Sequence, residues 1–466
     1  MPSPGKTAAL SISPDWALPG SALPGPEEDA VIGASALRKA SLRLLPILAI
    51  GYGMAYMDRI NISFASLRMN DDLHFSATVY GLGAGIFFIG YALCEVPSNL
   101  MMLRFGARRW LTRIMFTWGL LATCMMFVRT PWEFYTVRLL LGISEAGFFP
   151  GVIYYLTLWF PAPVRARAIS RFYISGPLSS AVSGALAGFL LGLDGRLGLT
   201  GWQWLFLAEG LPTALFSVAV FLLLPDSPAQ AQWLTAQEKH WLERQLSEEA
   251  VHAHIGREAG VMKALLSPKV WMIGMFFFCA LTCFYGYAFS APAIFQEATG
   301  WDVTRVGYLV AVIGLAGALA MLLGGISSDR SGERRFHCII PCCIMAVCFL
   351  VAGLAHPGWL VVGSLALMWL AFQAMLAPAL ALPTQFLSGP ACAAGIAAMN
   401  TITMFSGFVG PYWMGRMKDL TGSYWLGLYG LAIPALGAAG FMYALTRSLA
   451  RHRPPQPAVE LAEGPA

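Results

Sequence analysis

Charged residues are scarce in this chain. Lysine, arginine, aspartate and glutamate together make up 12% of its 466 residues, apolar residues make up 57%, and the mean hydropathy is +0.62. Soluble domains carry about 25% charged residues, so this composition excludes a water-soluble protein. The net charge of +5 is modest. It indicates how a membrane protein is oriented, and it gives no support to nucleic-acid binding.

Motifs of common enzyme classes are also lacking. The sequence contains no zincin helix, no phosphate-binding loop and no Gly-x-Ser-x-Gly nucleophile elbow. Its nine cysteines form no Cys-x-x-Cys pair. Four gather at the start of one apolar run, where packed thiols are a better interpretation than a metal site. These four are Cys338, Cys342, Cys343 and Cys348. We therefore expect no enzymatic activity, no cofactor and no bound metal.

Long apolar runs dominate what is present. Twelve follow one another, and each is long enough for the roughly 20 residues that a membrane-spanning helix needs. The sequence thus predicts an all-α membrane protein with twelve transmembrane helices. The approximate limits of the runs are 43–67, 78–103, 110–128, 132–159, 165–192, 203–224, 270–297, 303–327, 336–354, 359–385, 389–415 and 424–449.

The two ends of the chain differ from the runs between them. Residues 1–42 are rich in proline, serine, alanine and glycine, and they contain no apolar core of a secretory signal. This composition predicts a disordered tail, so the first span should serve as its own insertion signal. Residues 450–466 are expected to form a second tail.

One long polar stretch, residues 226–268, separates the sixth and seventh runs. Thr235 and Glu238 within it form a capping-box pattern, and apolar residues follow at helical spacing. The pattern predicts an amphipathic helix on the membrane surface that joins two six-helix bundles, residues 43–225 and 269–449.

Basic residues are distributed unevenly between the two sides of this membrane topology. The side with both termini has Arg38, Lys39, Arg43, Arg104, Arg108, Arg109, Arg113, Arg165, Arg167, Arg171, Arg330, Arg334, Arg335, Arg447, Arg451 and Arg453. The other side has only Arg68, Arg129, Arg196, Arg305, Arg416 and Lys418. Because basic loops stay inside, we expect both termini in the cytoplasm.

An internal repeat supports two related halves. Residues 103–109 follow the second run and residues 329–335 follow the eighth, each with a glycine and a pair of arginines. Two pseudo-symmetric bundles around a central cavity are typical of secondary transporters. We expect these two loops to clamp helix ends and gate the cytoplasmic face without touching substrate. Their residues are Arg104, Gly106, Arg108, Arg109, Asp329, Arg330, Gly332, Arg334 and Arg335.

Ionisable residues inside the runs are candidates for function, because charge at bilayer depth is costly. Asp58 and Arg59 lie past the middle of the first run. Arg138 and Glu145 lie in the fourth, seven residues apart and so on one helix face. A static ion pair is the alternative for Asp58 and Arg59, and for Arg138 a structural pairing with Glu145 is as good an interpretation as contact with substrate.

The remaining polar residues of the runs fall into two groups. Glu95 is expected to anchor basic loop residues or helix ends, and a structural role is the better interpretation for Glu209. The carboxy-terminal half offers mainly hydrogen-bonding side chains such as Gln373 and Asn400. The amino-terminal half should therefore hold charge, while the other half reads the rest of a substrate.

Several motifs make the chain resemble a known family. The pattern over residues 325–335 resembles the loop signature of the major facilitator superfamily, and further motifs resemble its anion:cation symporter family, the tartrate, phthalate, hydroxyphenylacetate and hexonate permeases. These further motifs are Asp58-Arg59-Ile60-Asn61-Ile62-Ser63-Phe64-Ala65, Glu95-Val96-Pro97-Ser98-Asn99, Gly142-Ile143-Ser144-Glu145-Ala146-Gly147-Phe148-Phe149-Pro150-Gly151, Trp159-Phe160-Pro161, Gly201-Trp202-Gln203-Trp204-Leu205-Phe206, Gly407-Phe408-Val409-Gly410-Pro411 and Lys418-Asp419-x-Thr421-Gly422-Ser423-Tyr424. The similarity covers about residues 40–447.

The resemblance implies a proton-coupled importer of a small organic carboxylate in a bacterial-type inner membrane, working as a monomer by alternating access. In the family, the acids that match Asp58 and Glu145 carry the proton. The matching arginine, Arg59, binds the carboxylate, and the asparagine that matches Asn400 lies near the pocket. Arg138, Tyr56, Tyr91, Asn400 and Gln373 complete the expected substrate site.

Departures from the family lie in the half that should choose the substrate. Ala379 and Leu380 stand where tartrate-type members usually carry Phe-Trp. Residues 391–393 and 403–405 also differ. We therefore carry over no named substrate. An anion exchanger or uniporter on the same fold remains the main alternative, and a membrane sensor that moves no solute is a remote one.

Overall fold

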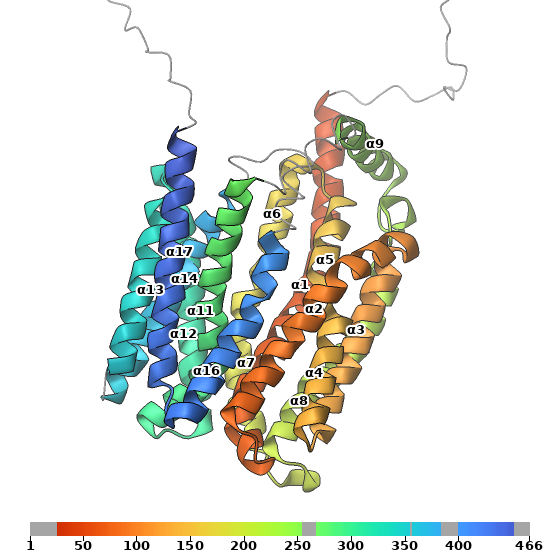
Figure 1. Cartoon of the computed structure of the whole chain (residues 1–466). Coiled ribbons are helices and arrows are strands. Elements are labelled where there is room, and N and C mark those ends of the chain that lie inside the picture. Colours follow the sequence, from red (N-terminus) through yellow and green to blue (C-terminus); the bar gives the residue numbers. More distant parts are fainter. Residues whose placement is uncertain (1–25, 254–266, 355–356, 384–398, 452–466) are drawn as a thin grey trace, which may run out of the picture.

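Helices make up nearly all of the described chain. The computed structural model describes residues 26–253, 267–354, 357–383 and 399–451, and these residues contain no strand. The long helices run side by side between two ends of the molecule (Figure 1). The start of α1, the end of α17 and helix α9 share one end, which we call the α9 end.

The first half precedes α9 and the second half follows it. The first half comprises α1 (Pro26–Asp72), α2 (Ala77–Phe105), α3 (Ala107–Cys124), η1 (Met125–Phe127), α4 (Pro131–Glu145), α5 (Phe148–Thr157), α6 (Ala162–Tyr173), α7 (Ser175–Leu191), η2 (Arg196–Gly198) and α8 (Gly201–Leu223). The connection holds η3 (Pro228–Gln230) and α9 (Ala236–Ala253). The second half comprises α11 (Pro268–Thr299), α12 (Val303–Ser331), α13 (Phe336–Leu354), α14 (Gly358–Leu380), α16 (Ser406–Thr421) and α17 (Trp425–Arg451).

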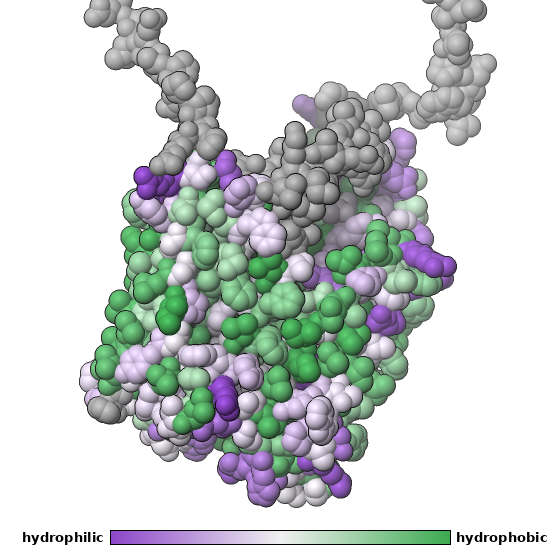
Figure 2. Space-filling model, in the orientation of Figure 1, coloured by the Kyte–Doolittle hydropathy of each residue, from purple (hydrophilic) through white to green (hydrophobic). Residues whose placement is uncertain are grey.

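Eleven stretches of the described residues are long and apolar enough to cross a membrane. They match eleven of the twelve predicted runs. The remaining run, residues 389–415, overlaps residues 384–398, which lie outside the described chain, and α16 is its described end. Figure 2 shows hydrophobic residues across the middle of one face and hydrophilic residues toward its ends, as expected where lipid tails surround the middle.

The amino-terminal tail ends earlier than the sequence predicted. Residues up to 42 were expected to be disordered, but α1 already begins at Pro26. Acidic residues fill its first turn, where they favour a helix start. The added turns also pack against α9, because Gly33 lies directly beneath the ring of Trp241. A contact between segments so far apart in sequence could not be read from local composition.

Helix α9 is held to α1 by polar contacts. The predicted capping box is confirmed, since Thr235 and Glu238 bond to each other's backbone N–H at 2.9 and 3.3 Å. Glu238 also forms an ion pair with Lys39 at 2.8 Å and accepts a hydrogen bond from Ser35. Arg244 pairs with Asp29 at 2.6 Å. The connecting helix therefore belongs with the first half (Figure 1).

The fourth predicted span is not one continuous helix. Helix α4 stops at Glu145, and α5 starts at Phe148. Gly147 between them has φ +87°, a conformation that costs other residues free energy, and a Cβ there would meet Ser98 Oγ at 2.4 Å. The break leaves Glu145 at the last position of a helix in the protein interior. The fifth predicted span is likewise divided into α6 and α7.

The two halves meet closely at the end opposite α9, which we call the Asp419 end. Asp419 of α16 accepts hydrogen bonds from the first backbone N–H groups of α2, at Ala77 and Thr78 (3.0 and 2.8 Å). Tyr80 of α2 donates to the carbonyl of Phe289 in α11 at 2.7 Å. Helix α16 lies beside α2 in Figure 1.

Small residues allow the second close approach between the halves. Two glycines of α7 pack on α12: a Cβ on Gly184 would meet the Gly307 carbonyl oxygen at 2.7 Å. Gly188 lies against Thr304, whose hydroxyl donates to the Gly188 carbonyl at 3.3 Å. A larger residue at either position would push the two helices apart.

Acidification should loosen α9 from α1. Burial raises the pKa of Glu238, but hydrogen bonds from Lys39, Ser35 and the Thr235 backbone outweigh it and lower that pKa from its ordinary 4.5 to about 2. A carboxyl with a lowered folded pKa contributes stability above its unfolded pKa and loses it as pH falls. We expect hydrogen exchange of α9 to rise between about pH 4.5 and pH 2.

The substitution Glu238→Gln should loosen α9 already at neutral pH. Losing charge-assisted bonds costs about 1.5–3 kcal/mol, so exchange in α9 should become roughly ten times faster or more. Glu243→Gln, on the exposed side of the same helix, is the matched control. Equal protection of α9 in both variants would contradict this account.

Candidate functional site

A buried ion pair lies between α1 and α4. Arg59 donates from Nε to Glu145 Oε1 at 2.7 Å, and its Nη2 lies 2.5 Å from the same oxygen. The Glu145 side chain is fully buried, while that of Arg59 retains 17% exposure. The guanidinium is thus the partner that a solute could reach. The second carboxylate oxygen of Glu145 is buried and has no hydrogen-bond partner among the described residues.

Aromatic rings surround the Arg59 guanidinium. Its carbon lies 5.0 Å from the ring centre of Tyr91 and 5.8 Å from that of Phe87, both on α2. Ring faces attract a cation without neutralising it. Because α2 is packed against α4 through small residues such as Gly142, these rings are held in place. The site can therefore hold a charged guanidinium while leaving it free to pair with an anion.

Arg138 forms no ion pair with Glu145 and bonds instead to backbone carbonyls of α2. Its Nε and Nη2 donate to the carbonyls of Gly83 and Ala84 at 3.3 and 3.4 Å, and its guanidinium lies over Phe87. Glu145 pairs with Arg59 and not with Arg138. No carboxylate among the described residues lies within ion-pair distance of Arg138, although the side chain is 1% exposed. It is a buried cation without a contacting anion.

A second group of acids lies next to this pair. Asn61, one turn after Asp58, donates its amide to Glu209 of α8 at 2.8 Å and to Asp58 at 3.4 Å. All three side chains are buried. Sequence reasoning gave Asn61 no role and considered Glu209 structural. Spacing within α1 could have placed Asn61 beside Asp58, but the contact with α8 depends on tertiary packing.

The polar residues of the second half lie in separate places. Asn400 donates to Glu95 of α2 at 2.7 Å, so Glu95 bonds to the other half rather than to basic loop residues. Gln373 is buried in α14, beside Gly317 of α12. The structure therefore brings Tyr91 and Arg59 together but places Asn400 at a different contact between the halves.

A small cavity lies between the halves, and its lining includes Ile60, the residue that follows Arg59 in the chain. Its walls are mostly aromatic and aliphatic. They are formed by Tyr56, Ile60, Ser63, Phe64, Ser180, Phe284, Tyr287, Ala288, Ala291, Pro292, Val310, Ile313, Gly314 and Trp369. The indole N–H of Trp369 is buried and has no acceptor among the described residues. The cavity holds about 30 Å³, and none of its lining residues is charged.

The two repeated loops hold helix ends within their own halves. Gly106 and Gly332, with φ +87° and +64°, end α2 and α12. Arg108 lies over Phe221 of α8, and Arg335 lies over Tyr443 of α17. Each of these arginines thus holds the loop against a neighbouring helix of the same half.

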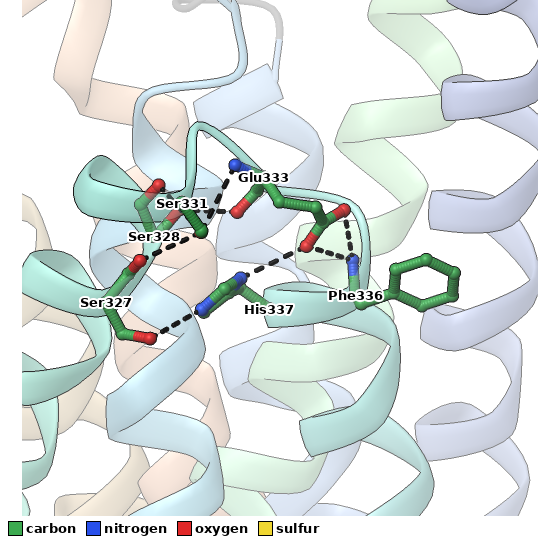
Figure 3. A network of polar contacts seen from close by, with 6 residues as sticks. All are labelled: Ser327, Ser328, Ser331, Glu333, Phe336 and His337. Carbon is green, nitrogen blue, oxygen red and sulfur yellow. Dashed lines mark hydrogen bonds and ion pairs between the residues drawn. The ribbon is translucent and has the colours of Figure 1, made fainter.

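The second loop is further fixed by a network that Figure 3 shows. Glu333 accepts from the backbone N–H of Phe336 at 2.8 Å and contacts His337 at 3.1 Å, and Ser328 donates to the Glu333 carbonyl. Outside this network, Arg334 lies 3.7 Å from Asp329 and donates to the carbonyl of Ala381 at 2.9 Å. The loop thereby ties α12, α13 and the end of α14 together.

Two helical bundles that meet around a buried charged site are the architecture of a secondary transporter. The family model described as Major Facilitator Superfamily matches residues 48–411, and the chain belongs to that family. The predicted fold class and the prediction that the chain is a transporter rather than an enzyme are confirmed. Proton coupling is a separate question.

Known relatives share most of their length with the chain. A protein of Agrobacterium vitis that carries the name of a tartrate transporter is 41% identical over 415 residues, which are 89% of this chain and 92% of the relative. A quinolone resistance transporter of Acinetobacter baumannii is 37% identical, over 90% of this chain and 96% of its own.

A solved structure shares the fold. A bacterial homologue of the human lysosomal transporter Spinster, in an inward-facing and occupied conformation, superposes with a TM-score of 0.73 at 16% identity. The match covers 89% of this chain and 98% of that one. At this identity the likeness supports the two-bundle fold alone.

Breaking the Arg59–Glu145 pair from one side should be far costlier than removing it altogether. Glu145→Leu leaves a buried guanidinium without its anion, which costs about 3–5 kcal/mol. Arg59→Met combined with Glu145→Leu replaces the pair by apolar side chains, and we expect most of that loss to be regained. Thermal unfolding of the detergent-solubilised proteins measures both. A double variant no more stable than Glu145→Leu would show that the pair is not the source of the loss.

Proposed function

We propose that the chain is a proton-coupled importer of small organic carboxylates. The observation that carries this proposal is the Arg59–Glu145 pair, in which a partly accessible guanidinium is neutralised by a fully buried acid. A substrate carboxylate suits the same guanidinium, because its two oxygens match the fork of arginine. The name of the Agrobacterium vitis relative supports a carboxylate as substrate.

Charge balance explains why an anion and a proton should move together. When a substrate carboxylate takes over Arg59, Glu145 loses its partner inside the protein. An ionised buried acid without a partner costs several kcal/mol, so Glu145 must take up a proton or keep the substrate out. Anion binding and proton uptake thus favour each other, which is the thermodynamic requirement for symport.

Asp58 is the second acid assigned to proton coupling. It is 4% exposed, and its Oδ2 has no partner among the described residues. Arg59 follows it directly in the chain, and the electrostatic field of Arg138 acts on it as well. Movement of Arg59 toward a substrate would therefore change the electrostatic environment of Asp58 and Glu145 together.

The second half is assigned to the remainder of the substrate. Phe284 and Tyr287 of α11 and Trp369 of α14 line the cavity, and the free indole N–H of Trp369 offers a donor to a hydroxyl or carbonyl oxygen. Tyr56 lines the same cavity from α1. Gln373 packs beside Gly317 and Asn400 bonds to Glu95, so neither lines the cavity, and we assign both to a later stage of the cycle, when the halves have moved.

The orientation proposed from basic residues places the α9 end in the cytoplasm of a bacterial-type inner membrane. The two repeated loops then lie on the cytoplasmic side, where their clamping of helix ends would steady the opening and closing of that side. The proposed unit is a monomer, since the charged site and both bundles belong to one chain.

Proton movement driven by substrate is the decisive test. The purified protein would be reconstituted in liposomes that enclose a pH dye, and sugar acids, hydroxy-dicarboxylates and aromatic acids would be added in turn. We expect one class to acidify the lumen, and Asp58→Asn and Glu145→Gln each to reduce this signal at least about tenfold, in the range of a lost proton-transfer group. Glu243→Gln, on exposed α9 surface, should behave as wild type.

The same liposomes distinguish the alternatives. Uptake of labelled substrate without acidification would overturn proton coupling and identify a uniporter. Uptake that requires substrate on the other side would identify an exchanger. Acidification by Asp58→Asn or Glu145→Gln equal to that of wild type would remove that residue from the coupling mechanism.

Alternating access requires the Asp419 end to close. Gly81 of α2 is packed on α16 so tightly that a Cβ would meet the carbonyl oxygen of Pro411 at 2.4 Å. Gly81→Leu should hold this end open, because overpacking costs about 1–3 kcal/mol. We expect transport to fall roughly tenfold while the protein remains folded by gel filtration. Gly363→Leu of α14, with open space at its Cβ, should transport normally. Normal transport by Gly81→Leu would show that this contact is not part of the cycle.

A further inference from the structure

Four acids and two bases share one buried region of the first half. The acids are Asp58, Glu95, Glu145 and Glu209, and the bases are Arg59 and Arg138. Arg59 and Glu145 neutralise each other by direct contact, and Arg59 also acts on Glu95. Arg138 has no contacting acid among the described residues, and its field acts most strongly on Asp58. Glu209 is the one acid of the four with neither a contacting base nor a base among the charges that act on it most.

Neutrality of this region requires bound protons. With every group ionised, the four carboxylates exceed the two guanidinium groups by two negative charges. An unbalanced charge away from water costs several kcal/mol, so two of the acids must be protonated. Protonating Glu209 costs the least electrostatic attraction, because both arginines act mainly on the other acids.

Asn61 connects this position to Asp58. Its amide nitrogen donates to both carboxyls, at 2.8 Å to Glu209 Oε2 and at 3.4 Å to Asp58 Oδ1. Three further oxygens are buried without a partner among the described residues: Asp58 Oδ2, Glu209 Oε1 and Asn61 Oδ1. A proton on either carboxyl would supply the O–H donor that Asn61 Oδ1 lacks. The trio can therefore accommodate one proton at either end.

We propose that Glu209 is a third proton-carrying acid, which holds a proton at rest and gives it to Asp58 during the transport cycle. This inference rests on the proposed symport function. In the step that we assign, the O–H bond at Glu209 breaks and an O–H bond at Asp58 forms, so that Glu209 becomes a carboxylate and Asp58 neutral. Asn61 orients both carboxyls throughout and is a positioning residue.

The surroundings of Glu209 leave few other groups that could exchange its proton. Helix α1 presents Asp58 and Asn61 to it. Helix α3 approaches α8 with Gly119 and Thr123 against Gly210, and neither side chain is ionisable. Helix α7 contains no ionisable residue. Arg138 and Glu145 of α4 act on Asp58, and neither is among the charges that act most on Glu209.

The test separates proton movement from substrate movement in one preparation. Wild type, Glu209→Gln and Asn61→Ala would be reconstituted with a lumenal pH dye and the active acid from the panel. Net proton flux would be compared with exchange of labelled for unlabelled substrate, which needs no net proton transfer. Ser217→Ala is the control, since this buried hydroxyl of α8 donates only to its own helix, at the Ala214 carbonyl.

We expect Glu209→Gln to reduce substrate-driven proton flux at least tenfold and to keep exchange within about threefold of wild type. Glutamine has the shape of protonated glutamate, so the variant should fold. Asn61→Ala should also reduce the proton flux, because no side chain then bonds to both Asp58 and Glu209. Ser217→Ala should change neither quantity.

Two results would overturn the inference while leaving symport intact. One is a Glu209→Gln protein with full proton flux. The other is a folded variant in which flux and exchange fall together, which would show that Glu209 acts in packing. If Glu209→Gln does not fold, wild-type flux in Asn61→Ala overturns the inference in its place. Wild-type uptake without protons would instead refute the proposed function itself.

Discussion

The contact between Arg59 and Glu145 is the constraint on which the rest of the structure depends. Two opposite charges inside a membrane protein cost least as a close pair, and this pair joins α1 to α4 at membrane depth. Glu145 reaches the site at the very end of α4, where Gly147 allows the helix to break. The aromatic wall on α2 then encloses the guanidinium. A competing anion, such as a carboxylate, can replace Glu145 without leaving Arg59 uncompensated.

The two halves contribute different kinds of side chain to the site. Every acid and arginine of the buried charged region comes from the first half, while the second half supplies aromatic walls to the cavity. The charges are therefore balanced within the first bundle. The sequence of the second bundle can then vary without disturbing the acids and arginines.

Much of this could be predicted from the sequence, because membrane spans and intramembrane charges are local signals. Asp58, Arg59, Arg138 and Glu145 were all found in this way, and they do lie in one buried region. Their pairing was not predictable: Arg138 shares a helix face with Glu145, yet Arg59 binds it. The roles of Asn61 and Glu209 and the early start of α1 depend on contacts across 148 and 203 residues of sequence, which no local pattern contains.

The hydrogen bonds at Asp419 have a consequence for how easily the molecule can change shape. Ala77 and Thr78 are exposed backbone donors, and water can replace the Asp419 carboxylate as their acceptor when the bundles part. A hydrogen bond to a charged group contributes about 1.5–3 kcal/mol, and exposure to water lowers this contribution for Asp419. The close packing of Gly81 and Gly415 therefore holds the halves together at this end, and the Asp419 hydrogen bonds align them. Such a closure can exclude solute when shut and still open when the halves move apart.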